Sequence, residues 1–549
     1  MKRRLWHFHG GLRLEGHKDL SMHTPVTTAP LPARIVLPLA QHIGAPAEPE
    51  VKVGEKVRTG QRIARATEYV SAPIHASTSG TVVAIEERAV PHPSGLPAPC
   101  IVIEADGQDE WIERQPVADY ESLDPSALRN VIREAGIVGL GGAGFPSFIK
   151  LNPGPDKVVD LLILNGAECE PYITCDAMLM QEHPRRIIDG LLIMRHALRA
   201  KRCIIAIEDN KKVAHTVLVN ALQKHEAEFI EIVQVPSIYP TGGEKQLIKV
   251  LTGKEVPSNG LPIDIGMVCH NVATAAAVHA AIAEGTPLIE RIVTVTGEAL
   301  DRPRNLVARI GTPFSLLLEA GQWREADTAE VLMGGPMMGF VVPDLGVPVV
   351  KTTNCLLARP RSRPHRQPAM PCIRCGQCAR VCPAQLLPQQ LYWHAHARNF
   401  DRIQDYHLFD CIECGCCAYV CPSHIPLVQY YRFAKTEIWA QERQKQKADR
   451  ARQRHEWHLE RLERRKREEE ERRRRKKELL KKSKAAGGDA AKKAEIEAAL
   501  ARVKAKKASR QTARANTENL TDAQKQAIAA VEARRQRLRK GSDSGGDAQ

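Results

Sequence analysis

The sequence has no long run of apolar residues, and it lacks the apolar stretch of a secretory signal. Its most prominent apolar runs, such as 35–40 and 161–164, have the length of β-strands and fall far short of the ~18 residues that a membrane-spanning helix needs. No apolar segment of signal length follows the basic residues at positions 2–4. We therefore expect no spanning segment, and we expect cysteine thiols in the reduced state that metal ligation requires.

The C-terminal part of the chain is poor in aromatic residues although it is strongly basic. The net charge of the chain is +15, and from Gln441 onward we count about 34 Lys and Arg against about 18 Asp and Glu. This tail has one tryptophan and many interleaved glutamates, so it lacks the aromatic series on which nucleic-acid bases stack. The composition disfavours nucleic-acid binding. It leaves a solvated charged helix or a contact with a membrane surface or protein partner, and we favour the contact.

Cysteine, in contrast, is abundant, and eight of the 15 cysteines form two runs with identical spacing. Both runs follow the pattern Cys-x2-Cys-x2-Cys-x3-Cys-Pro, which places three thiolates on one [4Fe-4S] cluster and sends the fourth to a second cluster. The expected ligands of the first cluster are Cys372, Cys375, Cys378 and Cys421, and those of the second are Cys411, Cys414, Cys417 and Cys382. Two neighbouring clusters relay single electrons.

Structural zinc and disulfides are the alternatives for these cysteines. Zinc sites usually use two Cys-x2-Cys pairs separated by a longer loop, which fits a triple with a trailing Cys-Pro poorly. Disulfides are disfavoured by the expected reducing surroundings. Cys416 interrupts the spacing of the second run, so we interpret it as a bystander.

Residues 35–105 alternate short apolar segments with glycine turns, for example at Gly54, Gly60 and Gly80. The pattern resembles the barrel-sandwich fold of biotinyl and lipoyl carrier domains. A carrier needs a lysine at the hairpin tip between its two halves, and the stretch 66–71 has none. We therefore expect a packing role for this domain.

Residues 126–287 show the succession of helix, glycine loop, buried strand and helix that is typical of an α/β layer fold. Asp124 and the following proline predict the start of an amphipathic helix over 128–135. After a glycine loop, 158–164 is predicted to be a buried parallel strand, because apolar residues occupy both of its faces. Ligands of open α/β sheets bind beyond the carboxyl ends of the strands, which directs attention to 165–171.

Short strands near 293–297 and a glycine turn at 334–339 predict a small β-grasp-like module, which we interpret as a spacer. A polar linker with prolines at 359–365 leads into the cysteine runs. Beyond Tyr431 large apolar residues become rare, so we expect an exposed charged helix over 450–482 and disorder after it.

The glycine loop gains significance from three further segments. The loop at 139–146, followed by Lys150, resembles the flavin-binding loop of the NADH-oxidising flavoprotein subunit of respiratory complex I. Segments 165–171, 239–245 and 270–274 match the same subunit in the same order. The residues that this resemblance implies for binding FMN and NAD(H) are Gly139, Gly141, Gly142, Gly144, Lys150, Asn165, Glu168, Glu170, Tyr239, Gly243, Glu244, Asn271 and Thr274.

Elementary chemistry agrees with those roles. Glycine amides and a lysine can approach a phosphate closely. Carboxylates suit the hydroxyl groups of ribose or ribityl chains, and asparagines can donate and accept hydrogen bonds at the edge of the flavin ring. A flavin also accepts a hydride as a pair of electrons and releases single electrons, as clusters require.

The whole chain resembles the RnfC family, the C subunits of the bacterial Rnf, or Rsx, ion-translocating oxidoreductase complexes, and its opening signature is 8–18, from Phe8 to Lys18. The resemblance implies a peripheral subunit on the cytoplasmic face of the inner membrane. Its implied partners are the integral-membrane and other subunits of the complex, NAD(H) and an iron–sulfur electron partner. Electrons would pass between NAD(H), FMN and two clusters, while other subunits couple that flow to cation movement.

The expected fold is therefore multidomain, combining α/β and α+β parts. Its segments are a barrel-sandwich at 1–120, an α/β FMN- and NADH-binding domain at 121–290, a β-grasp-like module at 291–350, a helical two-cluster ferredoxin-type domain at 351–435 and a basic tail at 436–549. Two other functions compete with the flavin hypothesis. One is a ferredoxin-type relay whose α/β domain binds neither flavin nor nucleotide, and the other is a binder of nucleic acid or membrane through the tail.

Overall fold

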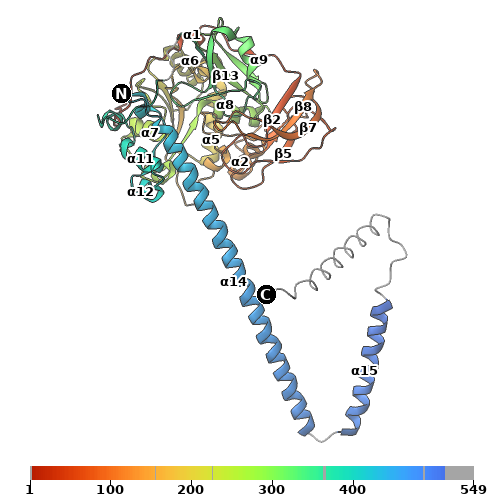
Figure 1. Cartoon of the computed structure of the whole chain (residues 1–549). Coiled ribbons are helices and arrows are strands. Elements are labelled where there is room, and N and C mark those ends of the chain that lie inside the picture. Colours follow the sequence, from red (N-terminus) through yellow and green to blue (C-terminus); the bar gives the residue numbers. More distant parts are fainter. Residues whose placement is uncertain (1–2, 155, 226, 363–366, 486–488, 513–549) are drawn as a thin grey trace. The chain divides into compact units, whose positions relative to one another are not determined.

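The computed structural model describes residues 3–154, 156–225, 227–362, 367–485 and 489–512 (Figure 1). The chain divides into two units, Met1–Gln441 and Glu442–Gln549, and all strands of the described residues lie in the first. Within those ranges, no helix combines the length and the apolar character needed to cross a bilayer.

The N-terminal domain is built from two small antiparallel sheets that enclose a common core (Figure 1). The first sheet has the order β2-β8-β7-β4, with β2 (Arg34–Pro38), β8 (Pro97–Ala105), β7 (Gly80–Ala89) and β4 (Lys56–Val57). The second has the order β3-β5-β6, with β3 (Glu48–Pro49), β5 (Arg62–Arg65) and β6 (Ile74–His75). Ile35, Ile63 and Ile103 are fully buried in the core that also contains Leu128 of the next domain, which agrees with a packing role.

The second domain is a parallel four-stranded sheet covered by helices on both faces. Its order is β11-β10-β9-β12, with β11 (Ile230–Val235), β10 (Arg202–Glu208), β9 (Leu161–Gly166) and β12 (Met267–Asn271). The helices are α2 (Pro125–Glu134), α3 (Ser147–Lys150), α4 (Cys175–Glu182), α5 (Pro184–Leu198), α6 (Lys212–Leu222), α7 (Glu244–Thr252) and α8 (Val272–Ala283).

Successive side chains of β9 enter different cores, which explains its continuous apolar sequence. Leu162 and Leu164 lie in the core of α5 and α8, whereas Leu161 and Ile163 pack with α7. The strand begins at Leu161 instead of the expected Val158. The helix expected after Asp124 is present as α2, and the Asp124 carboxylate accepts from the backbone N–H of Ser126 at 2.8 Å.

A mixed six-stranded sheet forms the third part. Its order is β1-β14-β13-β17-β15-β16, with β1 (Thr27–Thr28), β14 (Arg304–Arg309), β13 (Glu290–Thr296), β17 (Cys355–Pro360), β15 (Thr328–Met333) and β16 (Phe340–Val341). Helix α9 (Phe314–Ala320) packs on it, with Phe314 fully buried. The central pair β13 and β17 is parallel. Two strands of this sheet lie outside the expected 291–350 module, because β17 comes after residue 350 and β1 comes from the N-terminal segment.

The cysteine runs lie in a helical segment with a small core of its own. Its helices are α10 (Gln377–Arg380), α11 (Pro388–His396), α12 (Phe400–Asp405), α13 (Cys416–Tyr419) and the first part of α14 (Leu427–Ala485). Leu391, Ile403, Tyr431 and Ile438 are buried together in this core.

The second unit contains the rest of α14 and helix α15 (Asp489–Thr512). The expected exposed helix over 450–482 is present, with i,i+4 ion pairs such as Glu463–Arg467 at 3.6 Å. The expected disorder after 482 is wrong for 489–512, which are helical because alanine, lysine and glutamate favour helix formation. The prediction also covers 486–488 and 513–549, which lie outside the described residues.

Candidate iron–sulfur and flavin sites

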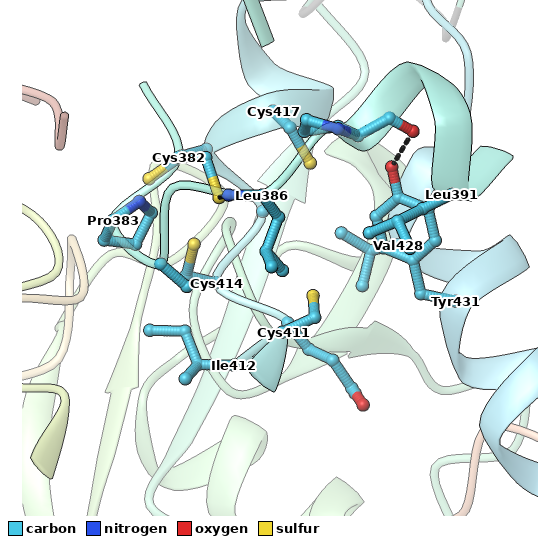
Figure 2. Close-up of a pocket in the computed structure, with 15 residues that line it drawn as sticks. Cys382, Pro383, Leu386, Leu391, Cys411, Ile412, Cys414, Cys417, Val428 and Tyr431 are labelled. Atoms are coloured by element: carbon cyan, nitrogen blue, oxygen red, sulfur yellow. Dashed lines mark hydrogen bonds between the residues drawn. The ribbon is translucent and has the colours of Figure 1, made fainter. Parts of the chain in front are cut away.

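Four cysteines from both runs line one cavity, which Figure 2 shows in close-up. The side chains of Cys382, Cys411, Cys414 and Cys417 point into this space, and Leu386, Leu391, Val428 and Tyr431 form its apolar wall. The Tyr431 hydroxyl donates to the backbone carbonyl of Pro388 at 2.7 Å and so fixes α14 to α11. Three cysteines of the second run thus meet the fourth cysteine of the first run.

A second cavity has the reciprocal composition. It is lined by Cys372, Cys375 and Cys378 from the first run together with Cys421 from the second. Cys375 is exposed, whereas Cys414 and Cys417 in the other cavity are buried. The grouping of the eight cysteines in the two cavities is the one that crossed ligation requires.

The two runs adopt the same backbone conformation at corresponding positions, which explains why equal spacing arranges the cysteines of the two runs alike. Arg374 and Glu413, each between the first and second cysteines of its run, both have φ of 57°. Gly376 and Gly415 follow the second cysteines with φ of 75° and 82°, a left-handed conformation that glycine adopts without cost. Short helices α10 and α13 then carry the third cysteines.

The cavities suit an iron–sulfur cluster in their donors and in their surroundings. Backbone N–H groups approach the sulfurs, with Leu386 N to Cys382 Sγ and Arg374 N to Cys372 Sγ both at 3.4 Å. Burial raises the pKa of the Cys411 thiol to about 12, so a bound cation is needed to stabilise its thiolate. A cluster supplies that positive charge, and N–H groups near the sulfurs tune its reduction potential.

Cys416, the expected bystander, is also fully buried and contributes to the wall of the second-run cavity. It packs with Tyr239 and Cys414 in a small cluster that joins the cysteine segment to the α/β domain.

The flavin-like segments meet at the carboxyl ends of β9 and β12. Asn165 and Asn271 are paired residues in the register of these adjacent strands. The glycine loop lies beside them, because the backbone N–H of Leu140 donates to the Thr274 hydroxyl at 3.0 Å. A Cβ added to Gly141 would lie 3.3 Å from the Cβ of Asn271. Segment 239–245 reaches the same edge, because the Asn165 amide donates to the carbonyl of Gly242 at 2.8 Å. The structure therefore brings all four segments together at one edge of the sheet.

The loop itself presents bare backbone. Gly142 has φ of 104°, and nothing lies within 4 Å of the position that its Cβ would occupy. The amides of Gly139 and Gly144 are used inside the loop, the first donating to the carbonyl of Phe145 and the second to that of Gly139. An exposed glycine backbone with free space in front fits the approach of a phosphate-bearing cofactor such as FMN.

Lys150 and Glu244 form an ion pair beside this edge, with Nζ and Oε1 2.5 Å apart. Lys150 also donates to the carbonyl of Cys269 in the middle of β12 (2.9 Å). Gly243 is the N-cap of α7 and places Glu244 in the first turn of that helix. The pair is only half-buried, so either side chain is available to a ligand.

Other candidate flavin residues also have partners inside the protein. Each asparagine uses its amide there, since Asn165 accepts from the Ala167 amide at 3.0 Å and Asn271 from the Ala273 amide at 2.8 Å. Glu168 accepts from Lys211 Nζ at 2.9 Å. Glu170 accepts from the backbone N–H of Met337 at 2.7 Å. The Tyr239 hydroxyl donates to the carbonyl of Cys414 at 2.5 Å, which places Tyr239 against the cysteine segment.

Several charged residues at this edge were not foreseen. Asp176 accepts from the Asn271 amide at 2.6 Å, and burial, followed by the charge of Glu168, raises the pKa of Asp176 to about 6. Asp176 lies a few residues beyond the expected 165–171 segment, so a wider search around that segment would have included it. Arg291 is buried and donates to the carbonyl of Leu140 at 3.2 Å, so its side chain is hydrogen-bonded to the glycine loop. The contact spans 151 residues of sequence, and no local pattern indicates it.

The fold and the cavities define an iron–sulfur protein built around a flavin-binding type of α/β domain, and comparisons with known proteins agree. Residues 132–280 match the Nuo51 FMN-binding domain, residues 6–108 the RnfC barrel sandwich hybrid domain and residues 371–425 the 4Fe-4S dicluster domain. FMN and 4Fe-4S clusters are thus the cofactors that the matched domains carry.

The chain is 52% identical over 458 residues to the C subunit of the ion-translocating oxidoreductase complex of Pseudomonas aeruginosa, an alignment that covers 83% of this chain and 59% of the relative. It is 51% identical over 465 residues to the protein of the same name from Edwardsiella ictaluri, covering 84% and 58%. The chain belongs to this family, RnfC, whose members are the C subunits of ion-translocating oxidoreductase complexes. It spans about three fifths of the length of these relatives.

Among solved structures, an NAD+-reducing [NiFe]-hydrogenase in the air-oxidised state is similar over 51% of this chain and 54% of that chain. The TM-score is 0.42 and the sequence identity is 21%.

Proposed function

We propose that this chain passes electrons between NAD(H), FMN and two [4Fe-4S] clusters as the peripheral subunit of a membrane-bound ion-translocating oxidoreductase. The observation that carries the proposal is the pair of four-cysteine cavities in the same compact unit as a matched FMN-binding domain. Other subunits would couple the electron flow to cation movement, and an iron–sulfur partner would exchange electrons with the clusters. The chain would bind at the cytoplasmic face of the inner membrane.

The proposed cluster ligands are those that share a cavity. Cys372, Cys375, Cys378 and Cys421 would hold the first cluster, and Cys411, Cys414, Cys417 and Cys382 the second. The apolar wall of the cavity that contains Cys411, Cys414 and Cys417 would exclude water from the second cluster. The finer fold belongs to the same proposal, with a β-grasp-like module around β13 to β17 and a ferredoxin-type arrangement of the helices at the cysteines.

The proposed flavin site lies at the carboxyl ends of β9 and β12. Bound FMN would convert the two electrons of a hydride into the single electrons that clusters accept. The Gly139–Gly144 backbone and Lys150 would bind its phosphate, and Asn165 and Asn271 would orient the ring by hydrogen bonds. Glu244 and Thr274 would complete the site, whereas Glu168 and Glu170 would support it from within through their internal partners.

The test is anaerobic purification of the full chain, followed by flavin, iron and sulfide quantitation and by titration with NADH. We expect one FMN and about eight iron atoms per chain, with NADH bleaching the visible absorption. Gly142→Val should abolish FMN binding and bleaching, because its side chain would project into the open space before the loop, and it should keep about eight iron atoms.

The matched control is Gly154→Val. Gly154 has φ of 93° and equally open surroundings, but it lies outside the Gly139–Gly144 loop, so its variant should retain FMN. Iron without flavin in the wild-type chain would refute the flavin site, and zinc in place of iron would refute the electron-transfer function.

We further propose that the basic tail contacts an anionic membrane surface or a partner subunit. Deleting Glu442–Gln549, the second unit, should leave FMN and iron contents unchanged. Membrane recovery should fall at moderate salt, because each basic residue near an anionic surface contributes about 1 kcal/mol. Sedimentation with membrane vesicles at several salt concentrations measures the effect, and equal recovery of both chains would contradict this role for the tail.

A further inference from the structure

The N-terminal signature at 8–18 has no function so far, yet it connects the cysteine segment to the α/β domain. At its beginning, His9 Nδ1 donates to the carbonyl of Cys382 at 3.0 Å, and the Gly11 amide donates to the carbonyl of Val381 at 3.0 Å. Gly10 packs closely against the backbone of the same turn, since a Cβ added to it would be 2.5 Å from the carbonyl carbon of Val381. Both carbonyls belong to the loop that carries the crossed ligand of the second cluster.

The middle of the signature pairs with Tyr239. The Leu12 amide donates to the Tyr239 carbonyl at 2.7 Å, and the Tyr239 amide returns a hydrogen bond to Leu12 at 2.8 Å. The Tyr239 hydroxyl in turn binds the carbonyl of Cys414. The Cys414 loop of the same cavity is therefore joined, through Tyr239, to residues 8–18.

The end of the signature fastens the loop that follows β9. Lys18 Nζ donates to the carbonyls of Glu168, Glu170 and Ile173 at 2.7, 2.9 and 2.6 Å. His17 stacks on Tyr172 with ring centroids 4.6 Å apart. One lysine thus satisfies three carbonyl groups of the segment that leaves the proposed flavin edge, and this arrangement holds the segment rigidly.

The ligand loop at Cys372, in the cavity of the first cluster, is anchored differently. Near Cys372, the Met370 amide donates to the carbonyl of Ser423 and the Ser423 hydroxyl donates to the carbonyl of Pro371, both contacts within the cysteine segment. This loop is exposed around Ile373 and Cys375. The two cavities therefore differ in how they are attached, and the signature contacts the cavity of the second cluster, which contains Cys382.

We propose that residues 8–18 form a strap that positions the Cys382 loop on the flavin-binding domain and so makes the second cluster the one that exchanges electrons with the flavin. The proposal rests on the function proposed above. NADH supplies a pair of electrons as hydride. Reoxidation of the flavin then takes two single-electron transfers to oxidised clusters, with release of its protons to solvent. His9 and Lys18 are positioning residues in this scheme.

The test compares Gly10→Val with Gly95→Val in the full chain. Gly10 and Gly95 have nearly equal φ values of 69° and 65°, but only the position of Gly95 is open, so the pair separates backbone strain from contact with Val381. Gly10→Val should keep FMN and iron while NADH-driven cluster reduction, followed by rapid-mixing absorption and electron paramagnetic resonance, slows on the order of tenfold. Flavin reduction itself should keep its rate, and Gly95→Val should match the wild type.

A wild-type rate of cluster reduction in Gly10→Val would overturn the strap. If NADH does not reduce the flavin of the wild-type chain, the proposed function is wrong instead. The two failures are therefore distinguishable. If Gly10→Val does not fold, hydrogen exchange of the wild type decides. The amides of Gly11 and Leu12 should exchange slowly, as protected backbone does, and rapid exchange at both would refute the strap.

Discussion

Replacing Cys421 with alanine should remove one complete cluster and leave the other in place. Cys421 belongs to the second run in sequence, but its side chain lines the cavity of Cys372, Cys375 and Cys378. A cubane held by three thiolates is labile, so the iron content should fall from about eight to about four atoms per chain. Metal analysis and electron paramagnetic resonance of the reduced protein measure the loss.

Double variants identify which cluster has been lost. Cys372→Ala added to Cys421→Ala should leave iron at about four, because both cysteines line one cavity, whereas Cys411→Ala added to Cys421→Ala should reduce it to near zero. Uncrossed ligation would exchange these two results. Cys416→Ala is the matched control, since Cys416 is a buried cysteine within the second run, and it should retain about eight iron atoms.

Lys211→Met should strongly destabilise the first unit. Lys211 is 1% exposed and lies 2.9 Å from Glu168 and 3.4 Å from Glu208, whose side chains are 5% and 2% exposed. Burial acts to lower the pKa of Lys211, but the two carboxylates outweigh it and raise that pKa, so the lysine is held charged. Removing the cation leaves two buried carboxylates without their shared partner, with Lys18 at 4.0 Å from Glu168, at a cost of about 3–5 kcal/mol.

Thermal unfolding followed by circular dichroism should show a decrease in Tm on the order of 10 °C. Lys201→Met is the matched control, because Lys201 makes an equally short ion pair with Asp160 at 2.8 Å but both side chains are more than half exposed, and it should leave Tm unchanged. Equal Tm values for the two variants would contradict the importance of the buried charge cluster.

The loss of stability in Lys211→Met should also depend on pH. Burial, followed by the charge of Glu168, already raises the pKa of Asp176 to about 6, and the charge of Lys211 acts to lower it. Without the lysine this pKa should rise further, so the folded variant binds protons more readily than the unfolded chain and its stability relative to the wild type should improve as the pH falls from 8 to 6. A constant difference in Tm across this range would contradict this coupling between Lys211 and Asp176.

Much of the architecture was predictable because it depends on local pattern. The cap at Asp124 and the following helix, the buried strand, the sandwich without a carrier lysine and the exposed helix over 450–482 all follow from neighbouring residues. Errors arose where local propensity was weighed wrongly. The strand begins at Leu161 instead of Val158, and 489–512 form a helix where disorder was expected.

The inward orientation of several candidate residues was not predictable. Glu168, Glu170 and Tyr239 were expected at a cofactor, but their partners Lys211, Met337 and Cys414 lie 43, 167 and 175 residues away in sequence. A carboxylate that receives a buried cation or a backbone amide has the same local sequence as one that faces a ligand. Only the packing of distant segments distinguishes the two.

By itself, the sequence determined the candidate ligands, because cluster ligation depends on short cysteine spacings that the backbone repeats faithfully. It also determined the order of the domains and the location of a glycine loop near strand ends. The tertiary structure alone decided which glutamates are neutralised internally and where the N-terminal signature binds. These outcomes depend on contacts between segments remote in the chain, for which local spacing and periodicity carry no information.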